Sequence, residues 1–255
     1  MLGKGKAEAV SASDIAAIAD ELACHPADLE AIAETESGGF GWFPNGQIKI
    51  LPEPHAFGDY LPKEKFARAK ALGLATDDYK ATKASGHYKK MTTGPGPRYA
   101  LLEKQIEYDR NAAFMGMSVG KYQIMGFNHA LCGYASAEAM FDAFCASEKF
   151  QLRAFANFLK KKGLVPAIRS RDFDKVEVGY NGGGQNGAYA VKMRAASAKL
   201  RAGKWAGYKP GSIDKATEPA AKPVEATKPP VAPTAPKRSL IQIIVDAIVA
   251  LFRKK

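Results

Sequence analysis

A proline-rich run divides this chain of 255 residues into parts that cannot all fold in the same way. Residues 209–238 are rich in Pro, Ala, Lys and Thr and hold seven of the 15 prolines, at positions 210, 219, 223, 229, 230, 233 and 236. Such a stretch buries too little apolar surface to offset the entropy lost on folding, so we predict an extended linker. The linker follows residues 1–208, which we predict to form one folded domain, and precedes a short tail, residues 239–255.

The tail is predicted to be an apolar helix with cationic ends. Its residues 239–252 would span about 21 Å as a helix, which is less than the roughly 30 Å hydrocarbon core of a membrane. Lys237 and Arg238 precede this stretch, and three basic residues, 253–255, follow it. We expect the tail to lie in the surface of an anionic membrane. Docking on the domain and self-association are the alternatives.

Positive charge extends over both the domain and the tail. The net charge is +11; from residue 209 onward nine Lys/Arg and four Asp/Glu give +5, which leaves +6 for the domain. Nucleic acid, an anionic membrane and the bacterial cell wall are all polyanionic partners that suit this charge. The basic residues show neither interleaved aromatic residues nor a recognition motif, so we expect no nucleic-acid binding.

Cysteine and histidine spacing argues against metal and disulfide chemistry. Cys24, Cys132 and Cys145 have no CxxC spacing, which favours three buried thiols. The four histidines have no ligand spacing, so we expect no metal site. The sequence implies no cofactor either. The first ten residues lack an apolar run behind Lys4 and Lys6. We therefore expect no secretory signal peptide and synthesis in the cytoplasm.

Local signals in the first part of the domain predict two helices. Ser13 and Asp14 can cap the first helix. Pro26 suits the first position of the second helix, and Gly38-Gly39 should end it.

The next segment predicts a β-hairpin, and the remainder is mostly helical. A Pro44-Asn45-Gly46 turn separates residues 40–43 from residues 47–51, in which apolar and polar side chains alternate. From Arg98 onward the helical pattern is clearest over residues 136–162. We predict an α+β fold that is mostly α-helical with one small hairpin.

Glu36 is the residue with the most specific chemical signal. Leu29, Ile32, Ala33 and Glu36 share one face of the second predicted helix, so a carboxylate lies on the core-facing stripe. It also lies in the last turn, where the helix dipole disfavours negative charge. Burial and the dipole would both raise its pKa, as a general acid requires. The alternative is a glutamate that points into water from a frayed helix end.

Glu53 is the candidate for a second catalytic carboxylate. It follows the predicted hairpin, between Pro52 and Pro54 and 17 residues after Glu36. A helix glutamate, a hairpin and a carboxylate at a strand end match the arrangement by which lysozyme-type glycosidases place two carboxyl groups across a sugar bond. The alternative is a solvated loop residue.

Four segments in order resemble one enzyme family. Residues 36–39 (Glu-Ser-Gly-Gly), 120–128 (Gly-Lys-Tyr-Gln-Ile-Met-Gly-Phe-Asn) and 179–183 (Gly-Tyr-Asn-Gly-Gly) resemble motifs of lysozyme-like and lytic transglycosylase domains. Residues 50–57 (Ile-Leu-Pro-Glu-Pro-His-Ala-Phe) are similar to a segment of the phage-type N-acetylmuramidases found in endolysins. The resemblance covers roughly residues 12–205 and implies a lysozyme-like fold.

The resemblance also implies a substrate, peptidoglycan glycan strands, and a set of site residues. Glu36 would be the general acid, and Glu53 a base, nucleophile or electrostatic partner. The implied glycan-contacting residues are Ser37, His55, Tyr122, Gln123, Tyr180 and Asn181. His55 can instead hydrogen-bond Glu53 or support the loop. For Gln123 the alternative is packing in a helix.

We therefore expect a monomeric endolysin that acts on the cell wall in the periplasm and hydrolyses the β-1,4 bond between N-acetylmuramic acid and N-acetylglucosamine. One alternative is a lytic transglycosylase, which forms 1,6-anhydromuramic acid. Another is a non-catalytic wall-binding or virion module with a membrane-active tail. The Lys-rich segment 80–90 is expected to be a solvated loop, or else a contact for the anionic wall.

Overall fold

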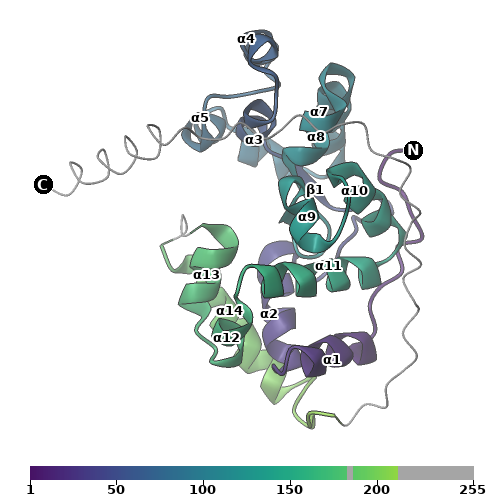
Figure 1. Cartoon of the computed structure of the whole chain (residues 1–255), viewed down its shortest axis with the longest axis vertical. Helices are drawn as coiled ribbons and strands as arrows, with labels where there is room; N and C mark the ends of the chain where they lie inside the picture. The colour runs from purple at the N-terminus through teal and green to yellow at the C-terminus, as the bar shows by residue number, and fades with distance from the viewer. Residues whose placement is uncertain (183–185, 212–255) are drawn as a thin grey trace, which may run out of the picture. The chain divides into compact units, whose positions relative to one another are not determined.

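The computed structural model describes residues 1–182 and 186–211 (Figure 1). The chain divides into two units, Met1–Glu218 and Pro219–Lys255, and every described residue belongs to the first. The predicted tail helix, and the predicted linker from residue 212 onward, lie outside the described residues. Within the described part, no helix combines the length and the apolar character needed to cross a membrane.

Helices dominate the described part of the chain, with a small sheet between them. The α-helices are α1 (Ala12–Glu21), α2 (Pro26–Ser37), α3 (Pro54–Asp59), α4 (Lys63–Ala71), α5 (Tyr79–Ala84), α6 (His87–Met91), α7 (Pro95–Tyr108), α8 (Arg110–Met115), α9 (His129–Cys132), α10 (Ala137–Ala146), α11 (Glu148–Lys161), α12 (Val165–Arg169), α13 (Phe173–Asn181) and α14 (Ala188–Ala202). The strands are β1 (Ile50–Pro52), β2 (Met117–Val119) and β3 (Ile124–Met125), and a 3₁₀ helix, η1, spans Gly126–Asn128. The predicted α+β class, mostly α-helical with a small sheet, is confirmed.

The N-cap of helix α1 is an earlier residue than the sequence suggested. Ser11, not Ser13, is its N-cap, and the side chains of Ser11 and Asp14 each accept a hydrogen bond from the other residue's backbone N–H. This capping box satisfies two N–H groups that a helix start leaves unpaired. Serine is favoured at an N-cap, so residue type alone cannot distinguish Ser13 from Ser11. Only the reciprocal hydrogen bonds with Asp14 identify Ser11 as the cap.

Helix α2 begins and ends where its sequence predicts. Pro26 occupies the first turn, where its missing N–H costs no hydrogen bond. Gly38 ends the helix in the left-handed conformation with φ of 69°, which side chains other than glycine rarely adopt. Leu29 and Ile32 are fully buried, so the predicted core stripe is present up to the last turn.

The predicted hairpin contributes only part of the sheet. The turn closes as expected, since the Phe43 N–H donates to the Gln47 carbonyl at 2.8 Å and Trp42 forms an isolated antiparallel bridge with Ile48. The three-stranded antiparallel sheet, however, has the order β1-β2-β3, with Ile50 opposite Val119. The main partner of β1 thus comes from a segment distant in the sequence. Pro52 is tolerated because β1 is an edge strand.

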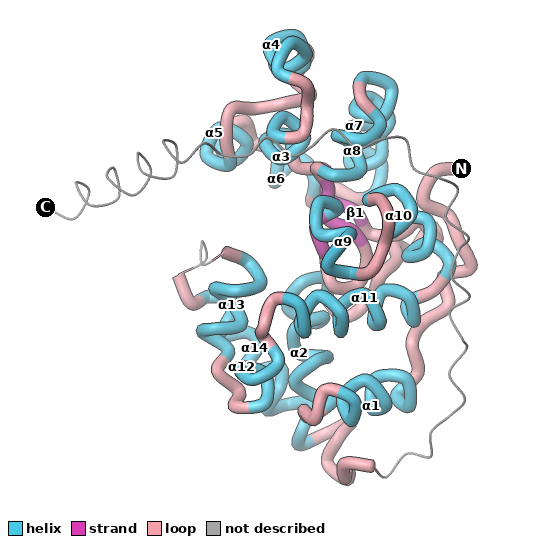
Figure 2. Tube along the Cα trace, in the orientation of Figure 1, coloured by secondary structure: helices cyan, strands magenta, loops and turns pink. Residues whose placement is uncertain are grey.

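Two groups of helices surround this sheet. Figure 2 shows α1, α2 and α11 to α14 gathered on one side of it and α3 to α8 on the other. Helix α14 packs along α2, and α7 packs against β1. The helical stretch predicted over 136–162 is divided between α10 and α11 by Ser147, whose extended backbone and capping side chain start α11.

The three cysteines are buried free thiols, as predicted. Burial raises the pKa of each thiol to about 12, so all three stay protonated at neutral pH.

The N-terminal segment contacts both the predicted hairpin and the start of α11. The Gly3 carbonyl accepts the Ile48 N–H at 2.8 Å, and the Glu8 carbonyl accepts the Glu148 N–H at 2.9 Å. Between these contacts a Cβ atom on Gly5 would lie 1.5 Å from the Cys145 carbonyl oxygen, so only glycine lets the chains approach this closely. The segment runs from the sheet to the start of α1 in Figure 1.

Candidate active site

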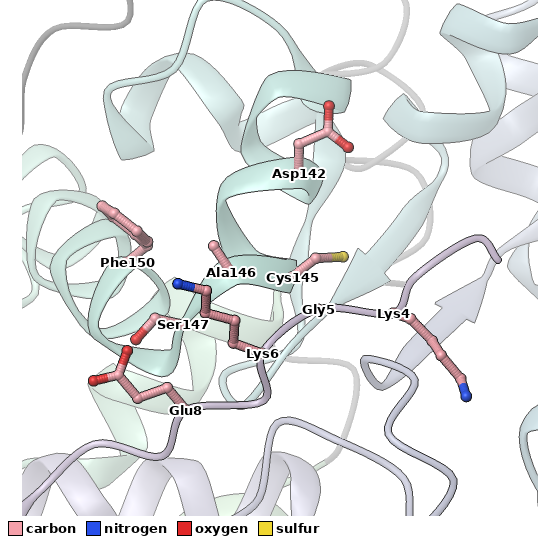
Figure 3. A pocket seen from close by; sticks show the side chains of 9 residues that line it. All are labelled: Lys4, Gly5, Lys6, Glu8, Asp142, Cys145, Ala146, Ser147 and Phe150. Atoms are coloured by element: carbon pink, nitrogen blue, oxygen red, sulfur yellow. The ribbon is translucent and has the colours of Figure 1, made fainter.

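Two cavities lie away from both predicted catalytic carboxylates. One, of about 400 Å³, lies between the N-terminal segment and the α10–α11 junction and is lined by residues that include Lys6, Asp142 and Phe150 (Figure 3). The other, of about 540 Å³, is lined by residues that include His25 and Arg201. Neither cavity is lined by a predicted site residue, so the candidate site is built from the carboxylates and their neighbours.

Glu36 is half-buried in the last turn of α2 and lies close to two tyrosines. Burial raises the pKa of Tyr180 on α13 and of Tyr189 on α14, and the nearby Glu36 carboxylate raises both further. Helix α14, which carries Tyr189, packs along α2, and α13, which carries Tyr180, packs against α14. Glu36 therefore has two tyrosine side chains in its neighbourhood.

Ser37 connects the end of α2 to the sheet. Its hydroxyl donates to the Lys121 carbonyl at 2.6 Å, and its own carbonyl accepts from Lys49 Nζ at 2.6 Å. Both groups are thereby engaged within the protein. Ser37 fixes the position of its neighbour Glu36 relative to the β2–β3 turn.

Gln123 holds the β2–β3 turn together. Its backbone has a positive φ of 45°, which is uncommon for a residue with a side chain. The amide nitrogen donates to the Gly120 carbonyl at 2.7 Å, and the amide oxygen accepts from the Ser118 hydroxyl at 2.9 Å. The side chain therefore stabilises a tight turn and not a helix, and its contact with a glycan stays a prediction.

Tyr122 lies in the core and does not line the site. Only 1% of the residue is exposed, and its ring stacks on Phe155 with centroids 4.0 Å apart. The prediction that this ring contacts a glycan is corrected by its burial. Its backbone has a different role, since the Tyr122 carbonyl accepts a hydrogen bond from the Tyr180 hydroxyl at 2.6 Å.

Tyr180 and Asn181 close helix α13. The Tyr180 ring packs edge-on against Phe155 and Phe158, which orients it next to Glu36. Asn181 is the last residue of α13, and its side chain lies outside the described part of the structure. Gly182 follows in the left-handed conformation.

Glu53 is largely buried at the start of α3, not solvated. Its side chain is 12% exposed, and its carboxylate accepts a hydrogen bond from the Tyr88 hydroxyl at 2.8 Å. Its backbone N–H donates to the Gly116 carbonyl at 2.9 Å. Burial raises the pKa of Glu53 to about 7, although the Tyr88 hydroxyl and the Arg98 guanidinium both act to lower it. A carboxyl group that titrates near neutral pH is suited to proton transfer.

His55 supports the region around Glu53. Its Nδ1 lies 3.7 Å from Glu53 Oε2 and 3.3 Å from the Thr82 hydroxyl, so the hydrogen bond is to Thr82. Burial lowers the pKa of His55, which favours the neutral ring and leaves no ion pair with Glu53 at neutral pH.

The Lys-rich segment is not the loop that we expected. It forms α5 and α6, which carry Tyr79 and Tyr88 toward Glu53. His87 is buried, and its Nε2 lies 2.9 Å from the Pro52 carbonyl oxygen. The aromatic residues among the lysines were the available sequence signal for this packing.

Tyr189 lies close to Glu36 and to an aromatic neighbour of the Glu53 region. After burial, Glu36 and then Tyr79 are the groups that raise its pKa, so Tyr189 lies near both. Tyr79 in turn contacts the rings of His55 and Tyr88, with centroids 5.8 and 5.7 Å away. Through Tyr189 and Tyr79, aromatic side chains thus link the neighbourhood of Glu36 to that of Glu53.

This arrangement defines a class of protein. A mostly helical α+β fold has one carboxylate at a helix end and another at a strand end, with tyrosine side chains near each. That combination is lysozyme-like. Among the described residues, no group of three or more His, Cys, Asp or Glu side chains is arranged to hold a metal ion.

Comparison with known proteins identifies the family. The N-acetylmuramidase family model matches residues 25–201, and the chain belongs to this family. It is a muramidase that cleaves peptidoglycan. The crystal structure of the Burkholderia AP3 phage endolysin is similar, with a TM-score of 0.63 and 28% sequence identity over 79% of this chain and 75% of that chain. No curated protein matches the sequence.

Proposed function

We propose that this muramidase hydrolyses the β-1,4 bond between N-acetylmuramic acid and N-acetylglucosamine, with Glu36 as the general acid. The observation that carries the proposal is the half-buried position of Glu36 at the end of α2, within the matched family region and beside Tyr180 and Tyr189. The likeness to a phage endolysin supports the same role here, in lysis of a bacterial host wall.

Glu36 and Glu53 have complementary tasks in the proposed reaction. Glu36 gives its proton to the glycosidic oxygen as the bond from that oxygen to the anomeric carbon breaks. A water oxygen bonds to the anomeric carbon, and its proton passes to the Glu53 carboxylate. One water is added overall, and return of the proton to Glu36 through solvent completes the cycle. The carboxyl groups of an inverting pair should lie about 6.5–9.5 Å apart.

The pKa of Glu53 determines in which direction kcat/KM should change with pH if Glu53 is the base. A base must be ionised, so kcat/KM should fall as pH drops below about 7, the pKa of Glu53 in the free enzyme. If Glu53 were the acid, kcat/KM would fall as pH rises above the same value. A pH profile on purified peptidoglycan separates the two roles.

The central test is Glu36→Gln, with Glu34→Gln as the matched control. Both residues lie on α2, but Glu34 is exposed. Glu36→Gln should fold normally and lose at least about 10²-fold in rate, the scale of general acid catalysis. Glu34→Gln should keep its activity. Near-normal lysis by folded Glu36→Gln protein refutes the assignment.

Product mass distinguishes hydrolysis from lytic transglycosylation. Hydrolysis adds water, whereas the anhydro product of a transglycosylase is lighter by one water. Mass spectrometry of digested peptidoglycan should show only reducing muramic acid ends. Anhydromuramic acid as the main product would replace hydrolysis with the transglycosylase reaction.

The same proposal gives residues 239–255 a separate task, which is binding to an anionic membrane. The support is the sequence: an apolar stretch between basic clusters, separated from the enzyme by a proline-rich run. Basic residues near an anionic surface contribute about 1 kcal/mol each to binding.

A further inference from the structure

The Glu53 carboxylate is held by a single hydroxyl group. Tyr88 donates to Glu53 Oε2 at 2.8 Å, and among the described side chains no other donor hydrogen-bonds this carboxylate. The side chain of Glu53 is 12% exposed, so little water is available to replace that donor. The orientation and charge of Glu53 therefore depend on Tyr88.

Tyr88 is itself fixed on both sides. The preceding residue, His87, is buried and bonded to the carbonyl of Pro52, the residue before Glu53. The Tyr79 ring packs against Tyr88 with centroids 5.7 Å apart. The α5–α6 region is thus attached to the segment that carries the carboxylate, and the phenol has a defined position.

We propose that Tyr88 is a positioning residue that orients the Glu53 carboxylate and stabilises its ionised form, so that Glu53 can take a proton from the attacking water. The inference rests on the proposed role of Glu53 as the base. Tyr88 has no proton-transfer step of its own. It acts only through Glu53, and its effect should be largest where Glu53 titrates.

The other charged and titratable groups around Glu53 do not replace the hydrogen bond that Tyr88 donates to its carboxylate. Arg98 from α7 favours the carboxylate, but its guanidinium also donates to the Ile50 and Met91 carbonyls. Burial lowers the pKa of His55 on α3 and of His87 on α6, which favours their neutral forms.

The acidic groups in this region act on neighbours of the carboxylate. Asp59 and Asp78 act to raise the pKa of His55, against the larger effect of burial. Tyr79 from α5 reaches Tyr88 and His55 through ring contacts. Within the described residues, Tyr88 is therefore the neutral donor whose loss most directly disfavours ionised Glu53.

The test is the pH dependence of kcat/KM for full-length Tyr88→Phe on purified peptidoglycan. A hydrogen bond to a charged group has a strength that corresponds to about 1 to 2 pKa units. The acidic limb should therefore move up by about 1 to 2 pH units, with most activity recovered on the alkaline side. Tyr60→Phe is the matched control, because Tyr60 ends the helix that Glu53 begins, and its acidic limb should stay in place.

Direct titration of the Glu53 carboxyl group distinguishes a specific effect on Glu53 from a general loss of activity in the variant. In protein labelled with ¹³C at the glutamate carboxyl groups, the pKa of Glu53 should rise in Tyr88→Phe and stay unchanged in Tyr60→Phe. The signal is assigned by its loss in Glu53→Gln. This measurement does not require an active enzyme, so it decides the inference even if the variant binds substrate poorly.

Failure of the inference and failure of the proposed function give different results. If Glu53→Gln is inactive but Tyr88→Phe leaves the acidic limb and the Glu53 titration unchanged, Tyr88 is not a positioning residue. A loss in Tyr88→Phe that is equal at every pH, without a change in the titration, also overturns the inference. If folded Glu53→Gln keeps its activity, the base role itself is wrong.

Discussion

Ionisation of the buried Glu53 carboxyl group should destabilise this enzyme as pH rises. Burial raises its pKa from 4.5, the usual value, to about 7 in the folded protein. Between these values the folded state holds a proton that the unfolded state has released. The contribution to stability is therefore fully present below pH 4.5 and is lost as pH rises through about 7. At about 1.4 kcal/mol per pKa unit, the loss is about 3 kcal/mol.

The substitution Glu53→Gln should remove this pH-dependent cost. An amide has nearly the shape of the protonated carboxyl group, stays neutral at all pH values, and can accept the Tyr88 hydroxyl bond. The variant should match the parent near pH 4 and exceed its free energy of unfolding by about 3 kcal/mol at pH 8. That gain is large beside a typical total of about 5–15 kcal/mol.

Urea unfolding at a series of pH values between 4 and 8 measures the effect. Tryptophan fluorescence can report the transition, since Trp42 is half-buried and Trp205 is buried. Comparing variant with parent at each pH cancels the titration of all other groups. Exposed Glu34→Gln is the control and should show no such trend. A stability difference that is constant with pH, or that grows toward acid, would refute the argument.

Three further predictions concern packing and the tail. Tyr122→Phe should keep full activity and gain about 1 kcal/mol in unfolding free energy, because the buried Tyr122 hydroxyl has no hydrogen-bond partner among the described residues. A large loss of activity would instead indicate that Tyr122 contacts the substrate. Glu148→Gln should cost about 3–5 kcal/mol by urea unfolding, because Glu148 is paired with buried Lys121 and accepts the Val10 and Gly41 N–H groups; a cost under 1 kcal/mol would contradict this. Truncation after Gly211 should leave hydrolysis of purified peptidoglycan unchanged but weaken salt-sensitive binding to anionic vesicles, and equal vesicle binding by both forms would refute the membrane role.

Some features of this protein were determined by signals within a few residues of one another. Pro26 and Gly38 set the ends of α2, and the 3.6-residue period placed Leu29 and Ile32 in the core. The order of the four motifs was enough to indicate the family that the comparison confirmed. Helix caps and hydrophobic periodicity act locally, so the sequence alone expresses them.

The tertiary structure alone decided which predicted residues meet at the site. Tyr122 and Tyr180 come from similar aromatic motifs, yet one is fully buried in the core and the other lies beside Glu36. The environment of Glu53 depends on Tyr88, which is 35 positions away in the sequence and lies in a segment that reads as a solvated loop. Burial, and the pKa values that follow from it, depend on every element packed around a group, whereas the sequence pattern reports only its neighbours along the chain.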